Sequence, residues 1–397
     1  MDQKRYTLTP LTAVHIGTGE EVTPLDYKLA NKIGDLDFKK PMYVKFSSDR
    51  ILKRLIEEGR EKDLTDFERA SVKGNMKDLQ EFFQNHCISI GDTDYPCDIT
   101  AGFLKTYNAN LNKDPLKNAA KVLQMYHIEG TPRPFIPGSS IKGSIRTALL
   151  NNYLDNLSNQ DYQLLQRNFK QEKFPENYEK KLQKELLEYR DTKDDPFRTI
   201  LIPDCPFKAT GTQLVGGLKI VSFNKTAEEL ESVGTQIQAE VLKGVLLGGK
   251  NVVSELQMSI NVDLQKIAFS VRQKVDTSKC IKTISFNDII TACNHFYWDE
   301  FLEEYNKFYK SVSDGTTDII EKLKKELEQA VNTKGQCIIR IGRWSQVEFV
   351  TFETNFRSPK TPKIKGKQMG FGTTRTLLDY NGNYVPMGWC VIKEQQT

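Results

Sequence analysis

The order in which strand-like and helix-like patterns follow one another restricts the fold of this chain more than any other feature. Alternating segments rich in Val, Ile and Thr predict strands at residues 5–16, 198–203, 213–223, 236–247, 252–262, 335–343, 347–352 and 384–393. Apolar residues at helical spacing predict helices at residues 47–58, 140–154, 287–311 and 318–330. A succession of strand, helix, two strands, helix and strand is that of a ferredoxin-like module. The sequence therefore predicts an α+β protein.

Length and composition favour two domains. The chain has 397 residues, of which 38% are hydrophobic, enough for more than one core. We place residues 1–212 in an N-terminal domain and residues 213–397 in a C-terminal domain that carries a glycine-rich loop. Two polar, charged stretches, at about residues 60–130 and 156–195, are predicted to be helical insertions in the first domain.

Cysteine usage and hydropathy exclude several classes of protein. The seven cysteines are scattered and odd in number, and neither a CxxC pair nor a zinc-like Cys–His spacing is present. No apolar run reaches about 18 residues, and the first residues lack an apolar signal region. We therefore expect a cytoplasmic protein with reduced thiols, no metal, no cofactor and no membrane contact.

Positive charge is concentrated in two stretches of the chain. Residues 102–146 contain seven Lys or Arg against two acids, and residues 334–375 contain nine against two. Two basic stretches separated by near-neutral chain are typical of a protein that follows a phosphate backbone. Arg343 lies in the second stretch and is a candidate RNA contact. A solvated surface explains the same pattern, and this alternative stays open.

The segment 134–149 (PFIPGSSIKGSIRTAL) gives the most specific indication of binding. A proline–glycine turn precedes the predicted helix, which Ser139 or Ser140 is expected to cap. The first amides of a helix carry partial positive charge and can bind a phosphate. Lys142 and Arg146 lie one turn apart and project from one face. A capped amphipathic helix without a ligand is the alternative.

The same segment resembles a nucleotide-binding P-loop only in part. Gly138 and Gly143 have the spacing of that motif, but Ser144 and Ile145 occupy the positions that require Lys and Ser or Thr. Nucleotide hydrolysis is therefore disfavoured. Gly143 is interpreted as a position where another backbone can approach the helix closely.

A glycine-rich segment, residues 366–375 (GKQMGFGTTR), is the second candidate. Its glycines flank one aromatic ring, and no acid interrupts the surrounding cations. Such a loop offers amides and cations to phosphates and a ring for stacking on an unpaired base. The candidate contacts here are Lys365, Lys367, Gly370, Phe371, Gly372 and Arg375. A simple turn is the alternative.

The segment 10–27 (PLTAVHIGTGEEVTPLDY) places His15 at a strand end. Gly17 and Gly19 follow it and let a ligand come near. As a general base His15 would need a partner, for which Asp26 and Tyr27 are candidates. A lone histidine is more often hydrogen-bonded and structural, and we favour that interpretation. We still count all three residues of this turn, His15, Gly17 and Gly19, as candidate RNA contacts.

Together, the segments 10–27, 134–149 and 366–375 resemble the RAMP superfamily of CRISPR-associated proteins. The PGSSIKGSIRTAL helix and the glycine-rich loop are features of the whole superfamily. The opening LTPLTAVHIGTGEEVTPLDY narrows the resemblance to the fifth subunit of the Csm complex, the type III-A effector. The resemblance implies two RRM-like (ferredoxin-like) domains with helical insertions, the second of them degenerate.

The resemblance also implies partners and a role. The chain would bind the 3′ portion of the guide RNA (crRNA) and contact the repeating backbone subunit and other subunits of the Csm complex. Backbone subunits of the superfamily cleave target RNA with an Asp in a loop. No equivalent can be assigned in this sequence, where Asp26 is the nearest candidate, so the resemblance argues against catalysis.

Three functions follow from these observations. The first is a structural crRNA-binding subunit that caps the 3′ end of the guide and contributes to crRNA maturation and antiviral defence. The second is a metal-independent endoribonuclease that processes guide-RNA precursor with His15 as general base. The third is a scaffold that recruits maturation nucleases, which the polar insertions suggest.

Overall fold

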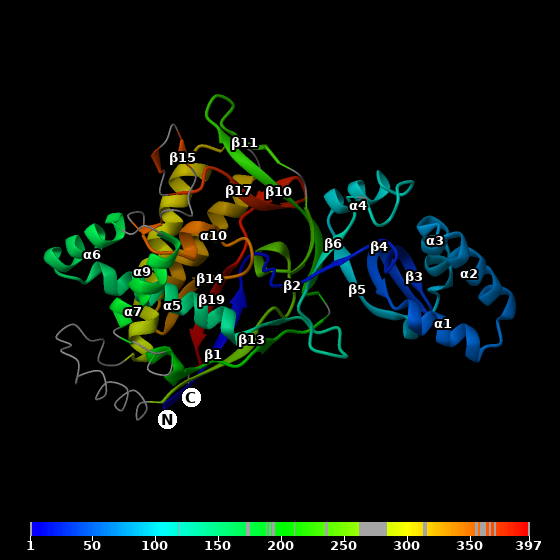
Figure 1. Cartoon of the computed structure of the whole chain (residues 1–397), viewed down its shortest axis with the longest axis horizontal. Helices are drawn as coiled ribbons and strands as arrows, with labels where there is room; N and C mark the ends of the chain where they lie inside the picture. Colours follow the sequence, from blue (N-terminus) through cyan, green and yellow to red (C-terminus); the bar gives the residue numbers. More distant parts are fainter. Residues whose placement is uncertain are drawn as a thin grey trace.

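The computed structural model of the chain describes residues 2–117, 119–171, 175–187, 189, 192, 195–209, 211–234, 237–261, 284–312, 316–353, 356–357, 363–364, 367–368 and 371–395. These residues form helices and several sheets, and the predicted α+β class is confirmed. Figure 1 shows an elongated molecule with a large body and a smaller lobe at one end. None of the described helices is long and apolar enough to cross a membrane.

A five-stranded antiparallel sheet lies within the body. Its strands, in spatial order, are β14 (Gln336–Arg340), β19 (Trp389–Glu394), β1 (Asp2–Pro10), β13 (Ser254–Ile260) and β8 (Ile200–Leu201). Strand β1 alternates in burial, and its inward residues Tyr6 and Leu8 are almost fully buried. Because β1 pairs with β13 on one side and β19 on the other, the N-terminal strand lies between two strands of the C-terminal half.

Helices α5 (Gly138–Asp155), α9 (Phe286–Glu304) and α10 (Thr316–Val331) pack against this sheet and share its core. On α5, Ile141, Ile145 and Ala148 recur at helical spacing and are 0% exposed. The aromatic stripe of α9 is core in the same way, and a π-helical turn, η5 (Tyr305–Tyr309), extends that helix. Helices α6 (Asn159–Gln171) and α7 (Pro175–Leu187) lie beyond α5, so most of the described residues between 156 and 195 are helical.

A ten-stranded sheet connects the body to the lobe. Its main path is β2 (Gly17–Val22), β6 (Val122–Met125), β12 (Ile237–Leu242), β10 (Gln213–Asn224), β5 (Thr93–Ile99), β4 (Leu36–Phe46) and β3 (Tyr27–Ile33). Strands β11 (Glu229–Ser232), β17 (Arg375–Tyr380) and β18 (Asn383–Val385) extend it beside β10. The long strand β10 pairs with β12 and β5 along its first half and with β17 and β11 along its second.

The lobe consists of β3, β4 and the helices α1 (Ser48–Glu57), α2 (Glu61–Lys73) and α3 (Met76–His86), and it projects from the body in Figure 1. It has its own apolar core, which includes Ile51, Leu55 and Phe83. Helix α4 (Ala101–Asn108) lies at its base. Ser47 caps α1 by accepting a hydrogen bond from the amide of Arg50, as a serine before a helix favours.

Short elements complete the described chain. They are the pairs β7 (Phe135–Ile136) with β9 (Cys205–Pro206) and β15 (Lys363–Ile364) with β16 (Lys367–Gln368), and the 3-10 turns η1 (Ile90–Asp92), η3 (Pro196–Thr199), η4 (Val245–Leu247) and η6 (Val347–Phe349).

Three local predictions were wrong. Residues 60–130 are not a purely helical insertion, because β5 and β6 belong to the ten-stranded sheet and bury Cys97 and Val122 beneath it. Residues 347–352 were expected to form a strand but begin with η6, which follows a turn after β14 and Gln346 with its positive φ of 69°. Residues 384–393 form two strands in different sheets, separated at Gly388, which has a φ of 92°.

The predicted boundary between residues 212 and 213 does not separate the sheets. The five-stranded sheet combines β1 and β8 from before it with β13, β14 and β19 from after it. The ten-stranded sheet also combines strands from both sides. Hydrogen bonding between distant parts of the chain therefore joins the two predicted halves.

Candidate nucleic-acid interface

Helix α5 begins at Gly138, and neither predicted serine caps it. The residue before the helix is Pro137, which has no side-chain cap, and the amide of Gly138 donates to Asp204 Oδ1 at 2.8 Å. A Cβ at Gly138 would overlap the carbonyl of Ile202, so only glycine fits this start. The predicted serine cap is therefore wrong. The carboxylate of Asp204 already occupies part of the position where an anion would bind at the start of the helix. Ser139 is exposed and Ser140 is half-buried.

Arg146 on α5 is half-buried and has partners within the protein rather than being free at the surface. Its Nη1 lies 2.8 Å from Asp195 Oδ2, and its guanidinium lies 4.7 Å from the centroid of the Phe197 ring. Lys142, one turn earlier, is half-buried, and burial lowers its pKa despite the attraction of Asp195. Of the two cations that were predicted to be free, only Lys142 remains a partly exposed candidate, because Asp195 and Phe197 contact Arg146.

His15 is 1% exposed, so its ring does not lie at the surface. Its Nδ1–H donates to the carbonyl of Glu240 at 2.6 Å, and Nε2 has no partner among the described residues. Burial lowers the pKa of His15. The hydrogen bond to the Glu240 carbonyl and the charge of the Glu240 carboxylate raise this pKa, but by less. A neutral, enclosed imidazole is what the structural interpretation of His15 predicts.

His15, Gly17 and Arg343 are brought together, as two segments far apart in sequence meet here. The amide of Arg343 donates to the carbonyl of His15 at 2.9 Å, and a Cβ at Gly17 would lie 2.6 Å from His15 Nε2. The ring of Trp344 lies 4.8 Å from that of His15. Arg343 and Gly19 are exposed, whereas Gly17 and Trp344 are half-buried. Trp344 was not singled out from the sequence, although a tryptophan next to an arginine in a basic stretch is a recognisable signal.

The glycine-rich segment is described only in part. Lys365 and Gly370 lie outside the described residues, and Lys367 is described only as backbone, in β16. Phe371 is half-buried, with Lys307 Nζ 3.6 Å from its ring centroid. The amide of Gly372 donates to Glu348 Oε1 at 2.7 Å. In the described chain, this amide and this ring already have partners within the protein.

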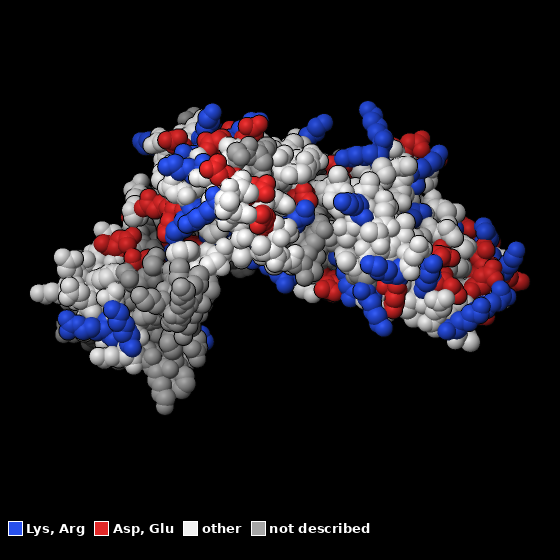
Figure 2. All heavy atoms as spheres, turned by 90° about the horizontal axis from the view of Figure 1, so that it is seen from above, with Lys and Arg blue, Asp and Glu red and all other residues white. Residues whose placement is uncertain are grey.

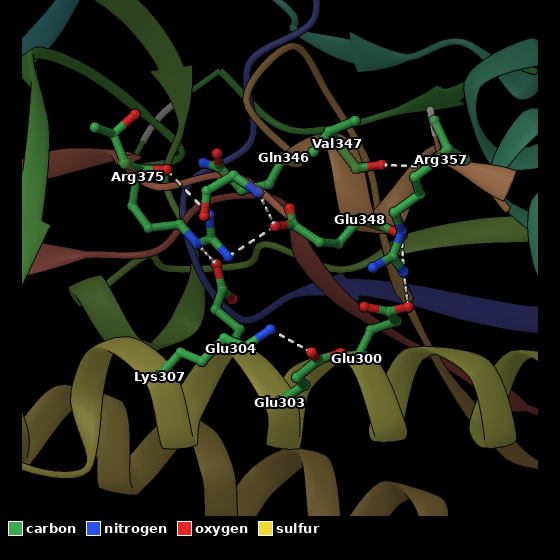
Figure 3. A network of polar contacts seen from close by, with 12 residues as sticks. Glu300, Glu303, Glu304, Lys307, Gln346, Val347, Glu348, Arg357 and Arg375 are labelled. Carbon is green, nitrogen blue, oxygen red and sulfur yellow. Dashed lines mark hydrogen bonds and ion pairs between the residues drawn. The ribbon is translucent and has the colours of Figure 1, made fainter. Parts of the chain in front are cut away.

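Arg375 was predicted to be a surface cation and is instead 1% exposed, within a network of buried ion pairs (Figure 3). Its Nε lies 2.7 Å from Glu304 Oε1 and its Nη2 3.1 Å from Glu348 Oε1. Burial alone would lower the pKa of Arg375, but these two carboxylates raise it above its ordinary value. Arg375 stays buried because the surrounding carboxylates compensate its positive charge.

Two further arginines extend the network. Arg340 Nη1 lies 2.8 Å from Glu304 Oε2, and Arg357 pairs with Glu300, one turn before Glu304 on α9. Burial, with the nearby positive charge of Arg375, lowers the pKa of Arg357 to about 10. The three arginines and three glutamates balance in charge, so the network stabilises the fold rather than offering charge to a ligand.

A cavity of about 400 Å³ opens between β2 and the start of α1. Asp26, Lys45, Arg50, Asp94 and Gln124 are among its lining residues. Burial raises the pKa of Asp26, although Thr23 donates a hydrogen bond to its Oδ2 at 3.1 Å. Lys45 Nζ is bound to Asp94 Oδ2 at 3.2 Å, so the cations of the cavity are engaged by an acid.

The described cysteines are buried and unbridged, and burial raises the pKa of Cys87 to about 11 and of Cys205 to about 12. Across the described ranges, no group of three or more His, Cys, Asp or Glu side chains could hold a metal ion. Figure 2 shows basic and acidic side chains interspersed over this face of the molecule. RNA contacts on this face would therefore depend on particular residues rather than on a uniformly positive surface.

The comparison with protein families assigns the class. The model of the RAMP superfamily matches residues 7–361, and the chain therefore belongs to the RAMP superfamily. No curated protein matches the chain.

Two solved structures resemble this chain over almost its whole length. A chain of the cryo-EM structure of a Csm–crRNA–target RNA ternary complex of a type III-A CRISPR–Cas system aligns with a TM-score of 0.61 and 16% identity, covering 99% of this chain and 100% of that one. The crystal structure of T. onnurineus Csm5 aligns with a TM-score of 0.60 and 16% identity, covering 97% of this chain and 99% of that one. At this identity the likeness establishes a common fold.

Proposed function

We propose that this chain is the non-catalytic, crRNA-binding subunit that caps the 3′ end of the guide in a type III-A CRISPR complex, and that it contributes to crRNA maturation and antiviral defence. The observation that carries the proposal is the likeness in fold to Csm5 over 97% of the chain, within a shared superfamily. Its partners would be the 3′ portion of the crRNA, the repeating backbone subunit and other Csm subunits, in the cytoplasm.

The strand order of the body supports an RRM-like, ferredoxin-like unit. Along the chain β1, α5, β8, β13, α9 with α10, and β19 give a βαββαβ succession, and β1 and β13 are neighbours in the sheet. Strand β14 comes between α10 and β19 and is an additional strand at the edge of this sheet. This unit draws on both ends of the chain. A second, degenerate unit would then lie in the ten-stranded sheet.

The RNA contacts would come from the exposed candidates. Among the described residues these are Gly19, Ser139 and Arg343. Lys142, which is half-buried and lies on α5 with Ser139, is a further candidate. Lys365, Lys367, Gly370 and the ring of Phe371 remain predictions. Contacts of this kind are made to phosphates, so they hold a guide without reading its sequence.

Binding of labelled guide RNA to the purified chain, followed against salt, tests the proposal. Affinity should fall steeply between about 50 and 200 mM salt, and the RNA should stay intact with or without Mg²⁺. Reconstitution with the other Csm subunits should then place the chain in the complex only when crRNA is present. A chain that binds neither RNA nor the complex would refute the proposal.

The endoribonuclease alternative has a specific difficulty. A general base must reach the 2′-OH of RNA, but the described surroundings enclose His15 and its Nδ1–H is engaged by Glu240. Defined cleavage of precursor that disappears in His15→Ala would restore this alternative. The scaffold alternative is compatible with the proposal, and deletion of residues 156–195 would test it by loss of a recruited nuclease.

A further inference from the structure

The loop between β14 and η6 is built to hold one shape. Gly342 has a φ of 101°, and a Cβ there would lie 2.6 Å from the carbonyl oxygen of His15, so only glycine fits. The hydroxyl of Ser345 donates to the carbonyl of Gly342 at 2.8 Å. Gln346, with its positive φ, donates from its side chain to the carbonyl of Trp344 at 3.2 Å. A loop fixed by its own hydrogen bonds presents its two remaining side chains, Arg343 and Trp344, in a defined place.

Trp344 is supported from below. Its ring lies 4.8 Å from the His15 ring at an interplanar angle of 36°, and it packs against the apolar core beneath the ten-stranded sheet, which includes Ala13 and Met387. The ring stays half-buried rather than enclosed. The imidazole of His15 thus contacts the Trp344 ring from the side of the core.

Arg343 lies beside Trp344 within the range of a cation–π contact. Its guanidinium carbon lies 5.5 Å from the centroid of the Trp344 ring, and the side chain is exposed. No carboxylate of the described residues forms an ion pair with Arg343, in contrast to Arg146 and Arg375. A guanidinium that lies beside an aromatic ring and has no carboxylate partner among the described residues leaves its charge available to a ligand.

We propose that Arg343 and Trp344 form a stacking site for one unpaired RNA base, with the Arg343 guanidinium against the base and Trp344 as its support. Single-stranded RNA is recognised by stacking its bases on aromatic rings or guanidinium planes, and the same guanidinium can reach an adjacent phosphate. The inference rests on the proposed RNA-binding function and names the residues that hold one base within it. The aromatic ring beside the guanidinium favours RNA over an acidic protein partner, because a base can stack there and a carboxylate side chain cannot.

Two substitutions at Arg343 separate stacking from charge. Arg343→Lys keeps the charge and removes the plane, whereas Arg343→Gln keeps a flat end group and removes the charge. The full chain would be titrated with a short oligoadenylate and with an abasic ribose-phosphate of the same length. Arg69→Lys is the matched control, because Arg69 is also exposed but lies on α2 of the lobe.

The expected results differ between the variants. Arg343→Lys should bind oligoadenylate about tenfold more weakly, the effect of losing one stacked base, and bind the abasic strand as the wild type does. Arg343→Gln should weaken both ligands and lower the slope of log affinity against log salt by about one. Trp344→Leu should follow Arg343→Lys, and Trp344→Phe, which retains a ring, should retain most of the preference for the base-bearing strand.

Three outcomes would overturn the inference. In the first, Arg343→Lys binds both strands as the wild type does while RNA binding persists, so the proposed function stands without this site. In the second, Arg343→Lys loses equal affinity for both strands, which reduces the site to a phosphate contact. In the third, Arg343→Gln loses binding to polyglutamate and keeps its binding to RNA, which assigns the surface to an acidic protein.

Failure of the wild type to bind any RNA would instead refute the proposed function. The Arg343 variants decide the question if Trp344→Leu does not fold, because Arg343 is exposed.

Discussion

Arg375 and Glu304 form an ion pair at 2.7 Å although each residue is at most 2% exposed. One turn earlier on α9, Glu300 pairs with Arg357 in the same way. The two arginines flank the glycine-rich segment in sequence, and both are bound to the same helix (Figure 3). An isolated buried charge is costly, so each of these arginines is held where its carboxylate lies. The basic character of residues 334–375 is thus partly internal.

Arg375→Met should destabilise the protein by about 3–5 kcal/mol, because it leaves the Glu304 and Glu348 carboxylates buried without one of their partners. Urea unfolding followed by circular dichroism measures this loss. Arg69→Met on the exposed surface of α2 is the control and should change the free energy of unfolding by less than about 0.5 kcal/mol. A loss below about 1 kcal/mol for Arg375→Met would contradict the assignment of this network to stability.

Arg375→Lys distinguishes a structural arginine from an RNA contact. Lysine keeps one positive charge but cannot satisfy both Glu304 and Glu348 with a planar fork, so stability should fall. RNA affinity measured on the folded protein should be unchanged, because the guanidinium is buried away from any phosphate. The reverse result, with normal stability and weaker RNA binding, would return Arg375 to the interface.

Two glycines of α5 offer a matched pair. A Cβ at Gly138 would overlap the backbone of Ile202, whereas a Cβ at Gly143 meets nothing within 4 Å. Gly138→Ala should therefore destabilise the protein by about 1–3 kcal/mol, since backbone cannot move aside cheaply. Gly143→Ala should stabilise it by about 0.5–1 kcal/mol, because alanine favours a helix interior.

The same pair tests whether RNA approaches α5. If the guide lies against this helix as proposed, Gly143→Ala should weaken RNA binding while it raises the melting temperature. A Gly143→Ala protein that is more stable and binds RNA normally would show that the guide does not come close to Gly143, and Lys142 would lose its support as a contact.

Regular elements with one buried face could be predicted from the sequence. The stripe of α9 and the alternation in β1 each follow one period, and burial follows the period. The β3–β4 hairpin was not predicted because charged residues, mainly lysines, interrupt its apolar residues and obscure the alternation. The strand β17 was not predicted because it directly follows a glycine-rich segment. Pairing between β1 and β19 depends on contacts across the whole chain, which no local pattern records.

The candidate site was harder to predict, since charge in a sequence does not reveal its partner. Arg146 and Arg375 have the same local signal as Arg343, but Asp195 and Glu304, both distant in sequence, engage the first two. Asp204 likewise reaches Gly138 from a separate segment. Motifs therefore indicate candidate segments, whereas burial decides which of their cations remain accessible.

Asp26 gives a stability effect with a definite sign. Its pKa is raised by burial, so between the ordinary value of 3.8 and the raised value the folded state binds more protons than the unfolded state. The free energy of unfolding therefore falls as pH rises through that interval. Asp26→Asn, which cannot ionise, should be more stable than the wild type at neutral pH, and the difference should shrink below pH 3.8. Equal stability at neutral pH would contradict the burial of this carboxyl.

His15 should give the opposite dependence. Its pKa is lowered from 6.5 in the folded state, so below that value the unfolded state binds more protons and stability is lost as pH falls. The loss grows by at most about 1.4 kcal/mol per pH unit until the lowered pKa is reached. His15→Gln removes the titrating group, so its stability should change less than that of the wild type between about pH 7 and pH 5. Thermal unfolding across this range measures the difference.

The same variant separates the structural role of His15 from a catalytic one. If His15 only supports Trp344 and accepts the amide of Arg343 on its carbonyl, His15→Gln should alter the pH dependence of stability and leave guide-RNA precursor intact, as in the wild type. Arg343→Lys is the control for the neighbouring loop, because it keeps the imidazole. Cleavage by the wild type that His15→Gln abolishes while the protein stays folded and binds the precursor would make His15 a base, because a general base is needed for the chemical step and not for binding.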